Sequence, residues 1–389
     1  MASKLSKNLK GQKMFQILNQ VQEMERKGRK IYHFELGEPF HKTPKSIPDK
    51  MIKSIQKGNT RYTSSFGNYD LRKSIVNTTK KTRGFQPDIN QVLITTGANS
   101  IIYYLIKIIC NPGDEVIIPS PGFPTYISAS KANGVKIKYL RLNEKNNYQI
   151  EIKEVKKLIS KKTKLIIVNS PSNPTGVIQT KESLVELYNF IKKYNNIFIL
   201  SDEIYSRITL EKNKFFSLSS LDKCLSKVVV LNGFSKAFSM TGYRIGCAIG
   251  PKDLIEKMRL LSETIVSCVP PFIQDACITA IKLNKKFLEK DLLEYVSKRD
   301  YIVKKFQKTR LTFAEPNGGF YIFPSLKKYK IDSELFCKQI LNRNGIALVP
   351  GNNFGVNCKY NFRLAFTSSF KDLRYSINKI VTYLKNYEN

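Results

Sequence analysis

Five short apolar runs recur between residues 92 and 231, and they constrain the fold more than any other feature of this sequence. Each run is continuous and largely β-branched, which is the pattern of a strand buried on both faces. The runs are Val92–Thr95, Glu115–Ile118, Leu165–Val168, Ile197–Leu200 and Val228–Leu231. Stretches with helical character lie between them, at 99–110, 121–133 and 180–194. This alternation predicts an α/β fold around a mixed, mostly parallel sheet that is flanked by helices.

The two ends of the chain differ from this central part. Residues 13–28 have apolar side chains at helical spacing, and residues 31–36 have the pattern of a short strand. After residue 284 we expect a long charged helix at 285–308 and a strand at 318–323. A length of 389 residues suits two domains. We predict a large domain at 46–284 and a smaller α+β domain built from both termini, 1–45 and 285–389.

The charge balance is strongly basic. The net charge is +34, from 65 Lys and Arg against 31 Asp and Glu. Such an excess can attract nucleic acids and anionic surfaces. The lysines are nevertheless spread from Lys4 to Lys385 without a dense block. We therefore interpret them as a solvated surface and expect no specific nucleic-acid partner.

Cysteine usage and the apolar windows indicate a cytoplasmic protein. Seven cysteines, an odd number without metal-ligand spacing, favour reduced thiols over a disulfide framework or a metal site. Residues 1–10 are followed by no apolar run, so no secretory signal is expected. The most apolar window, Ile101–Cys110, is too short to span a membrane and contains Lys107.

Histidine is scarce. The only two are His33 and His41, both near the N-terminus. A histidine metal site or a histidine-based triad would need further partners. If the protein is an enzyme that moves protons, we expect a different side chain to carry them.

One lysine stands in an unusual setting. Lys236 lies between Ser235 and Ala237, and Arg244 follows eight positions later with glycines at 242 and 246. An amine can attack a carbonyl to form a Schiff base, and a guanidinium binds two phosphate oxygens in its planar fork. This pattern suits an amine that reacts with a carbonyl beside a bound phosphate.

Two further segments follow expected strands. Thr95–Ser100 is a turn of small residues that leads into a helix, where backbone N–H groups favour an anion. An ordinary capped turn is the alternative. Pro119–Tyr126 is a Pro-Gly loop in which Phe123 can present a flat ring, although a core phenylalanine is equally compatible.

Polar residues also stand where buried strands end. Asn173 begins an Asn-Pro-Thr-Gly turn, at the strand end where ligands bind in open α/β sheets. Asp202 and Glu203 follow the next strand, and strand alternation sends them to opposite faces. Arg363 lies in an apolar run and needs either a fixed acid or a carboxylate ligand. Structural salt bridges remain the alternative for these charged residues.

Together, in this order and at these spacings, the segments resemble the class I/II aminotransferases that use pyridoxal 5′-phosphate (PLP) on the type I fold. The resemblance covers about residues 30 to 370. It implies that Lys236 is the Schiff-base lysine. It also implies that Arg244, Ser235 and the backbone amides of Ala98 and Asn99 bind the cofactor phosphate.

The same resemblance implies contacts to the cofactor ring and the substrate. The ring would be contacted by Phe123, Asn173, Tyr205 and Asp202, with Asp202 at the ring nitrogen. Arg363 would bind the substrate α-carboxylate, with the backbone of Gly37 and Asn173 nearby. Lys236, Asp202 and Tyr205 would be the catalytic residues. Tyr62 matches a tyrosine that reaches the phosphate of a partner subunit, which implies a homodimer.

The resemblance thus predicts a ping-pong aminotransferase that passes the amine of an α-amino acid to a 2-oxo acid. A β-eliminating C–S lyase or a related synthase on the same fold is the nearest alternative. A PLP-sensing regulator or nucleic-acid binder is a more distant one. The chain departs from the family pattern at Gly233, where many relatives have serine, and at Phe40, which follows the proline without the usual aspartate. Asn99 stands where some aspartate-using relatives carry lysine.

Overall fold

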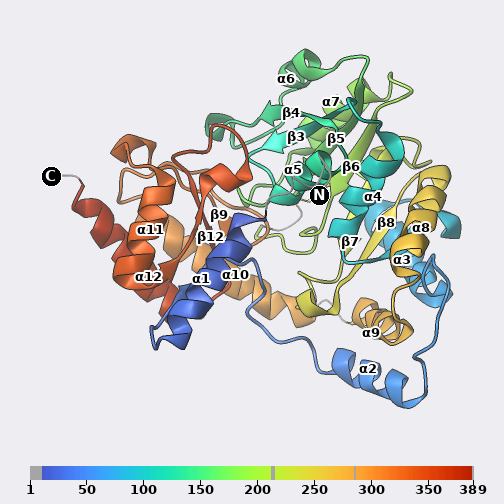
Figure 1. Ribbon diagram of the computed structural model, residues 1–389, viewed down its shortest axis with the longest axis horizontal. Coiled ribbons are helices and arrows are strands. Elements are labelled where there is room, and N and C mark those ends of the chain that lie inside the picture. The colour runs from blue at the N-terminus through green and yellow to red at the C-terminus, as the bar shows by residue number, and fades with distance from the viewer. Residues whose placement is uncertain (1–10, 212–214, 284–285, 388–389) are drawn as a thin grey trace, which may run out of the picture.

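The computed structural model describes residues 11–211, 215–283 and 286–387. A seven-stranded sheet forms the centre of its larger lobe (Figure 1). The strands are β2 (Val92–Thr96), β3 (Glu115–Ser120), β4 (Lys136–Arg141), β5 (Thr163–Asn169), β6 (Phe198–Asp202), β7 (Val228–Gly233) and β8 (Ile245–Ile249). Their order is β2-β8-β7-β6-β5-β3-β4. β8 runs antiparallel to both of its neighbours and the other strand pairs are parallel, so the predicted mixed, mostly parallel sheet is confirmed.

Helices cover both faces of this sheet. The helices of the large lobe are α2 (Ser46–Gln56), α3 (Tyr69–Arg83), α4 (Asn99–Ile109), α5 (Pro124–Ala132), α6 (Ile152–Leu158), α7 (Lys181–Ile191), α8 (Lys252–Val266) and α9 (Pro271–Lys282). Ile166 and Val168 of β5 pack in one core cluster with α3, α7 and α9. Leu165 and Ile167 pack in another with α4, α5 and α8. Alternate residues thus bury opposite faces, which explains the continuous apolar runs.

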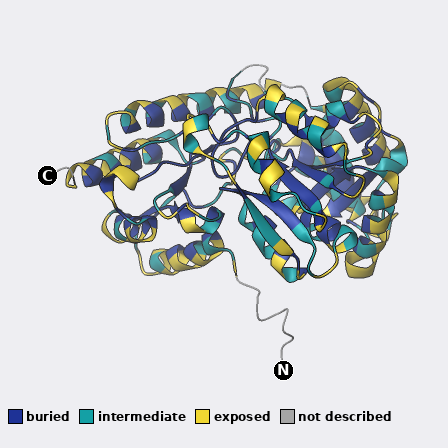
Figure 2. Ribbon diagram, turned by 90° about the horizontal axis from the view of Figure 1, so that it is seen from above, coloured by how far each residue is buried: buried dark blue, intermediate teal, exposed yellow. Residues whose placement is uncertain are grey.

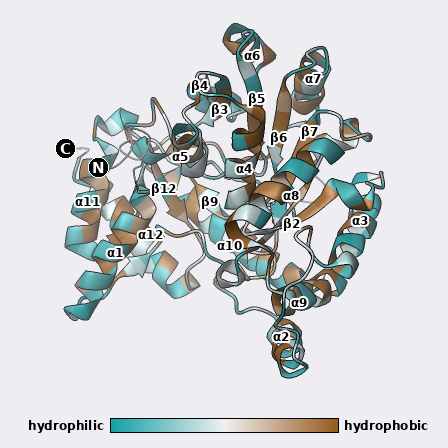
Figure 3. Ribbon diagram, turned by 45° about the vertical axis from the view of Figure 1, so that its right-hand side comes forward, coloured by the Kyte–Doolittle hydropathy of each residue, from teal (hydrophilic) through white to brown (hydrophobic). Residues whose placement is uncertain are grey.

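The pictures show the same layering. In Figure 2, exposed residues gather on the outer faces of the helices, while the interior of the lobe is buried. In Figure 3, β5 and β6 are hydrophobic ribbons between helices with hydrophilic outer faces.

The smaller lobe combines both ends of the chain. It contains α1 (Lys13–Arg26), β1 (Tyr32–His33), α10 (Lys286–Phe306), β9 (Tyr321–Ile322), α11 (Ser333–Asn344), β10 (Ile346–Ala347), β11 (Val349–Pro350), β12 (Phe362–Ala365) and α12 (Phe370–Lys385). β1 pairs in parallel with β10, so the N-terminal segment joins a strand more than 300 residues later. The antiparallel strands β11, β12 and β9 form a second small sheet.

The predicted elements agree with this structure in type and differ in extent. The expected strand at 31–36 is reduced to β1, and the one at 318–323 is reduced to β9. β4 and β8 were not predicted. The domain boundaries at residues 45 and 284 remain a prediction, and position 284 lies outside the described residues. Segment 1–10, for which we expected no secretory signal, also lies outside them. In the described part of the chain, no helix combines the length and apolarity that crossing a membrane requires.

A buried ion pair fixes the carboxyl end of β6 against α3. Nη2 of Arg83 lies 2.5 Å from Oε2 of Glu203, and both side chains are almost completely buried. The hydroxyls of Ser217 and Ser201 donate to Oε1 of Glu203 at 2.6 and 3.0 Å. These donors compensate the cost of taking a carboxylate out of water. They hold Glu203 on the face of the sheet opposite to that of its neighbour Asp202.

This pair should be a large single contribution to the stability of the large lobe. Replacing Glu203 with Gln leaves Arg83 buried without a countercharge, so we expect unfolding to require about 3–5 kcal/mol less. Urea denaturation followed by circular dichroism measures this. The control is Glu23→Gln, which breaks a solvent-exposed pair with Arg26 and should cost about 0–1 kcal/mol. Equal effects of the two substitutions would contradict the assignment.

Candidate active site

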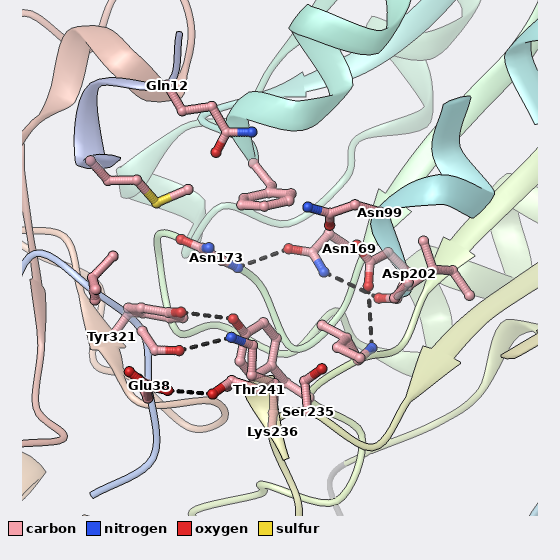
Figure 4. A pocket seen from close by; sticks show the side chains of 18 of the residues that line it. Gln12, Glu38, Asn99, Asn169, Asn173, Asp202, Ser235, Lys236, Thr241 and Tyr321 are labelled. Atoms are coloured by element: carbon pink, nitrogen blue, oxygen red, sulfur yellow. Dashed lines mark hydrogen bonds between the residues drawn. The ribbon is translucent and has the colours of Figure 1, made fainter. Parts of the chain in front are cut away.

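A cavity of about 450 Å³ opens at the carboxyl ends of β5, β6 and β7, between the two lobes. β5 and β6 both end on a polar residue at this edge. Asn169 of β5 and Asp202 of β6 are register partners, and β7 leads directly into the loop that carries Lys236. Figure 4 shows these side chains converging on the pocket. Ligands bind at this edge of open α/β sheets.

The acid at the bottom of the cavity is Asp202. Its Oδ2 accepts a hydrogen bond of 2.6 Å from the Tyr126 hydroxyl, and its Oδ1 accepts one of 3.2 Å from the Ile204 amide. Burial raises the pKa of the Asp202 carboxyl to about 6, although these two hydrogen bonds oppose the rise. Asp202 is therefore ionised at neutral pH and presents a negative charge to whatever fills the cavity.

Lys236 supplies the amine. Its Nζ donates a hydrogen bond of 2.8 Å to the carbonyl oxygen of Gly37, across the junction of the lobes. Burial lowers the pKa of Lys236 to about 8, and the positive charges of Arg363 and Arg244 lower it further against the opposing effect of Glu38 and Asp202. An amine with this pKa has an appreciable neutral, nucleophilic fraction near neutral pH.

One end of the cavity is built to hold an anion. Helix α4 begins at Asn99, after a turn in which Gly97 adopts φ +73°. A Cβ on Gly97 would lie 2.7 Å from Nη2 of Arg244, so glycine lets this guanidinium approach the turn. Ala98 follows Gly97 in this turn, and Ser235 also lines the cavity. A helix N-terminus beside an arginine binds phosphate or a similar anion.

The opposite end is dominated by Arg363, whose side chain is completely buried. Its Nη1 donates to Oδ1 of Asn173 at 3.1 Å, and its Nη2 donates to the carbonyl oxygen of Glu35. The ring of Tyr321 lies 4.7 Å from the guanidinium carbon. The sequence left two partners open for Arg363, a fixed acid or a carboxylate ligand. Arg363 forms no ion pair among the described residues, so the structure does not provide the fixed acid. Burial lowers the pKa of Arg363, and its charge remains available to a carboxylate ligand.

The cavity brings together all but one of the site residues predicted from the sequence. Those that line it are Gly37, Ala98, Asn99, Phe123, Asn173, Asp202, Tyr205, Ser235, Lys236, Arg244 and Arg363. Tyr62 does not line it and is 88% exposed. The predicted separation of Asp202 from Glu203 is confirmed, since Glu203 pairs with Arg83 on the other face. The role of each residue remains a prediction at this point.

Three residues that sequence reasoning did not assign complete the polar network. The Tyr126 hydroxyl fixes Asp202, and Asn169 donates to the backbone carbonyl of Asp202 at 3.1 Å. The hydroxyls of Tyr205 and Tyr321 lie 2.7 Å apart. Asn169 stands at a strand end, which was a usable signal. Tyr126 lies within the Pro-Gly loop motif and Tyr321 within an apolar run, where each has the pattern of a core residue.

In the described ranges, no group of three or more His, Cys, Asp or Glu side chains could hold a metal ion. His33 is hydrogen-bonded to Glu35 and Glu25, and His41 lies 3.0 Å from Glu294. Both histidines are thus engaged in polar contacts away from the cavity lining.

Comparison with known proteins gives one consistent result. The family model for aminotransferase class I and II matches residues 30–380. The aspartate aminotransferase of Bacillus subtilis is 33% identical over 379 residues, which is 95% of each chain. The asparagine–oxo-acid transaminase of Streptococcus mutans is 32% identical over 371 residues, 93% of each. The crystal structure of aspartate aminotransferase from Thermotoga maritima superposes with a TM-score of 0.92 at 28% identity, covering 99% of this chain and 100% of that one.

The lowered pKa of Lys236 can be measured directly. In the cofactor-free protein, reductive methylation followed by peptide mass mapping should label Lys236 with a midpoint near pH 8, since burial disfavours its ammonium form. Arg244→Gln should move this midpoint upward, toward the ordinary value of 10.5, because a repelling cation is removed. Arg26→Gln, on the exposed surface of α1, is the matched control and should leave it unchanged. A wild-type midpoint above pH 10 would show that the pKa of Lys236 is not lowered.

Proposed function

The chain belongs to the class I and II aminotransferase family, and from that membership we propose a role for each polar group of the cavity. The protein is a PLP-dependent transaminase, which transfers the amino group of an α-amino acid to a 2-oxo acid. An eliminating lyase is not favoured, because the relatives described above are aminotransferases. Their names include both aspartate and asparagine, so family membership leaves the amino-acid donor open.

The donor set of the cavity fits the cofactor. PLP carries a phosphate, a ring nitrogen and an aldehyde, and the cavity holds an anion-binding end, a buried carboxylate and a free amine. A Cβ on Gly246 would lie 2.6 Å from the amide nitrogen of Ala98, so glycine at this position leaves that turn its shape. When bound, PLP supplies an electron-withdrawing ring and an aldehyde that carries the amino group.

The phosphate is proposed to bind at the N-terminus of α4. The backbone N–H groups of Ala98 and Asn99, the Ser235 hydroxyl and the Arg244 guanidinium are its donors. Arg244 is held by a hydrogen bond of 2.7 Å from Nη1 to the Thr241 carbonyl, which directs the rest of the fork at the turn. A charged fork and a helix terminus together bind a dianion more strongly than either alone.

The ring is proposed to lie between Phe123 and the strand ends. Asp202 then faces the ring nitrogen, and its ionised carboxylate keeps a proton there. Tyr126 orients that carboxylate through its 2.6 Å hydrogen bond. Asn173 and Tyr205 contact the phenolic oxygen, and Tyr321 orients Tyr205. The acid and its tyrosine partner are both buried, so water does not screen this charge.

Lys236 is proposed to attach the cofactor and then to carry the proton. In this role Nζ would take a proton from the substrate Cα and return it. A pKa of about 8 suits both tasks, because the amine gains and loses a proton within the physiological range. Arg363 is proposed to bind the α-carboxylate, with the Gly37 backbone beside it. This interaction orients the Cα toward Nζ.

A homodimer is proposed, with Tyr62 reaching the phosphate site of the partner subunit. The observation in its favour is exposed apolar surface on α2, which precedes this tyrosine in the chain, and on α8. Ile52 and Ile55 of α2 are 50% and 42% exposed, and Ile265 of α8 is 53% exposed. The loop after Tyr62 is held against α8 by Arg259, whose Nη1 donates to the Ser65 hydroxyl at 2.9 Å. Exposed apolar side chains of this size favour a protein partner.

A cytoplasmic location is also proposed. All seven cysteines are free thiols, and four of them are buried. Burial raises the pKa of the Cys247 thiol to about 12, which makes it unreactive. Free cysteines in this number suit a reducing compartment.

The single observation that carries the function is the buried amine of Lys236 within one cavity with Asp202 and Arg244. Lys236→Ala should reduce transamination by about 10³-fold or more, since the attachment point and the proton carrier are both lost. Borohydride reduction with peptide mapping should label Lys236 in the wild type and nothing at that peptide in the variant. Lys13→Ala, at a surface pair with Glu334, is the control and should retain full activity. An active Lys236→Ala variant would refute the proposal.

The dimer proposal has its own test. Tyr62→Phe removes one hydrogen bond to a charged phosphate and should weaken cofactor binding about tenfold to a hundredfold. Equilibrium dialysis measures the affinity, and sedimentation velocity measures the oligomeric state. Tyr69→Phe, at an exposed position near the same loop, is the control. A monomer with unchanged cofactor affinity in the variant would rule out a tyrosine shared between subunits.

A further inference from the structure

One wall of the cavity has no role in the scheme above. It is formed by Gln12, Met14 and Phe15 at the start of α1 and by Leu36 and Glu38 after β1. If the α-carboxylate lies on Arg363 and the amine at Lys236, as the proposed function has it, the remaining direction for the substrate side chain is toward this wall. The composition of the wall therefore determines which amino acids fit.

The amide of Gln12 is the polar group of this wall that lacks a partner. Its Nε2 donates to the Thr125 hydroxyl at 2.9 Å, which anchors the start of α1 on α5. Its Oε1 is buried and accepts no hydrogen bond from any described residue. Figure 4 shows Gln12 reaching into the pocket, on the side opposite Lys236. A buried carbonyl without a donor costs about 1–3 kcal/mol, which a ligand N–H or O–H would recover.

Among the residues that the structure describes, this wall contains no positive charge. The cations that line the cavity, within the described residues, are Lys236, Arg244 and Arg363, and each already has a role. Lys13, next to Gln12, is directed to Glu334 at 3.8 Å. The one ionisable group of the wall is the carboxylate of Glu38, which accepts a hydrogen bond from Thr241. A side-chain carboxylate would lose its hydration here and gain no countercharge from the described residues of the wall.

We propose that Gln12 determines the substrate class, and that the preferred donors are amino acids with an uncharged carboxamide side chain. The carboxamide N–H groups would donate to Oε1 of Gln12, while Met14 and Leu36 pack against the aliphatic part of the side chain. Acidic side chains of the same length would be disfavoured. The new assignment is thus a specificity-determining residue and the chemical class that it selects.

Isosteric substrates separate hydrogen bonding from size and charge. Glutamine, methionine and glutamate have side chains of similar length, and so do asparagine, leucine and aspartate. The holoenzyme is mixed with each one, and the loss of the bound-cofactor absorbance gives kcat/KM of the half-reaction. We expect the carboxamide of at least one set to exceed its apolar isostere by roughly tenfold and its acidic isostere by more, because a buried acceptor is left unpaired by the isosteres.

The Gln12→Met variant tests the residue itself. It should bring the ratio of carboxamide to apolar isostere close to one, with little change in kcat/KM for methionine or leucine. Gln16→Met, on the exposed face of the same helix, is the matched control and should keep the wild-type ratio. Cofactor content, measured by absorbance, should be the same in all three proteins, since Gln12 is not assigned to the cofactor.

The outcomes distinguish this inference from the function on which it rests. If glutamate or aspartate reacts as fast as its amide, the inference is wrong. This holds also if the acidic side chain is bound by a cation from a partner subunit. An unchanged ratio in Gln12→Met also overturns it. If no amino acid reduces the cofactor band although Lys236 is labelled by borohydride, transamination itself is wrong and the inference falls with it.

Discussion

The burial of the Arg363 guanidinium is the interaction on which the arrangement of the two lobes depends. The side chain is completely buried, and taking such a cation out of water costs several kcal/mol unless its N–H groups are satisfied. Its partners come from three segments that are distant in sequence. Asn173 belongs to the large lobe, the Glu35 carbonyl to the N-terminal segment, and the Tyr321 ring to the small sheet. These segments must meet for Arg363 to be buried at all.

Burial in the cavity shifts the pKa values of two of its ionisable groups, Asp202 and Lys236, in opposite directions. Burial raises the pKa of Asp202 to about 6 and lowers that of Lys236 to about 8. Between these values the carboxylate stays ionised, while the amine is within two pH units of losing its proton. A fixed negative charge and a mobile proton in one site are what proton transfer at carbon requires. The fold creates both with desolvation, and neither needs a histidine.

The sequence predicted those parts of the fold that one local pattern determines. In β6, a continuous apolar run followed by two acids predicted a buried strand and sent Asp202 and Glu203 to opposite faces. β4 lies at the edge of the sheet and alternates lysine with apolar residues, so it lacks the fully buried pattern. β8 is built from Ile, Gly, Cys and Ala, with few β-branched side chains, because it packs closely on its neighbours. β1 is short because its only partner in the described structure is β10.

Site residues were predictable where a strand end or a helix start determines their position, and not where two distant elements must first pack. Lys236, Asn173 and Asp202 follow strands, so their place at one edge of the sheet follows from parallel topology. Gln12 and Tyr321 arrive from the small lobe. Gln12 faces the cavity because its side chain is hydrogen-bonded to Thr125 of α5, which lies 113 residues away in the sequence. No local periodicity carries that information, since a glutamine at a helix start has the pattern of a solvent-exposed residue.

The N-terminal segment binds two cations of the cavity without neutralising their positive charge, which leaves that charge available to anionic ligands. Two backbone carbonyls of this segment accept hydrogen bonds from the cations, Glu35 from Arg363 and Gly37 from Lys236. A neutral carbonyl satisfies a donor without cancelling its charge, so a carboxylate that arrives gains the stronger, charge-assisted bond. His33 of this segment is hydrogen-bonded to Glu35 and, through its other ring nitrogen, to Glu25 of α1, and its pKa is raised to about 9, mainly by the bond to Glu35. His33 is therefore protonated at neutral pH. Its two hydrogen bonds link α1 to the segment whose carbonyls bind Arg363 and Lys236.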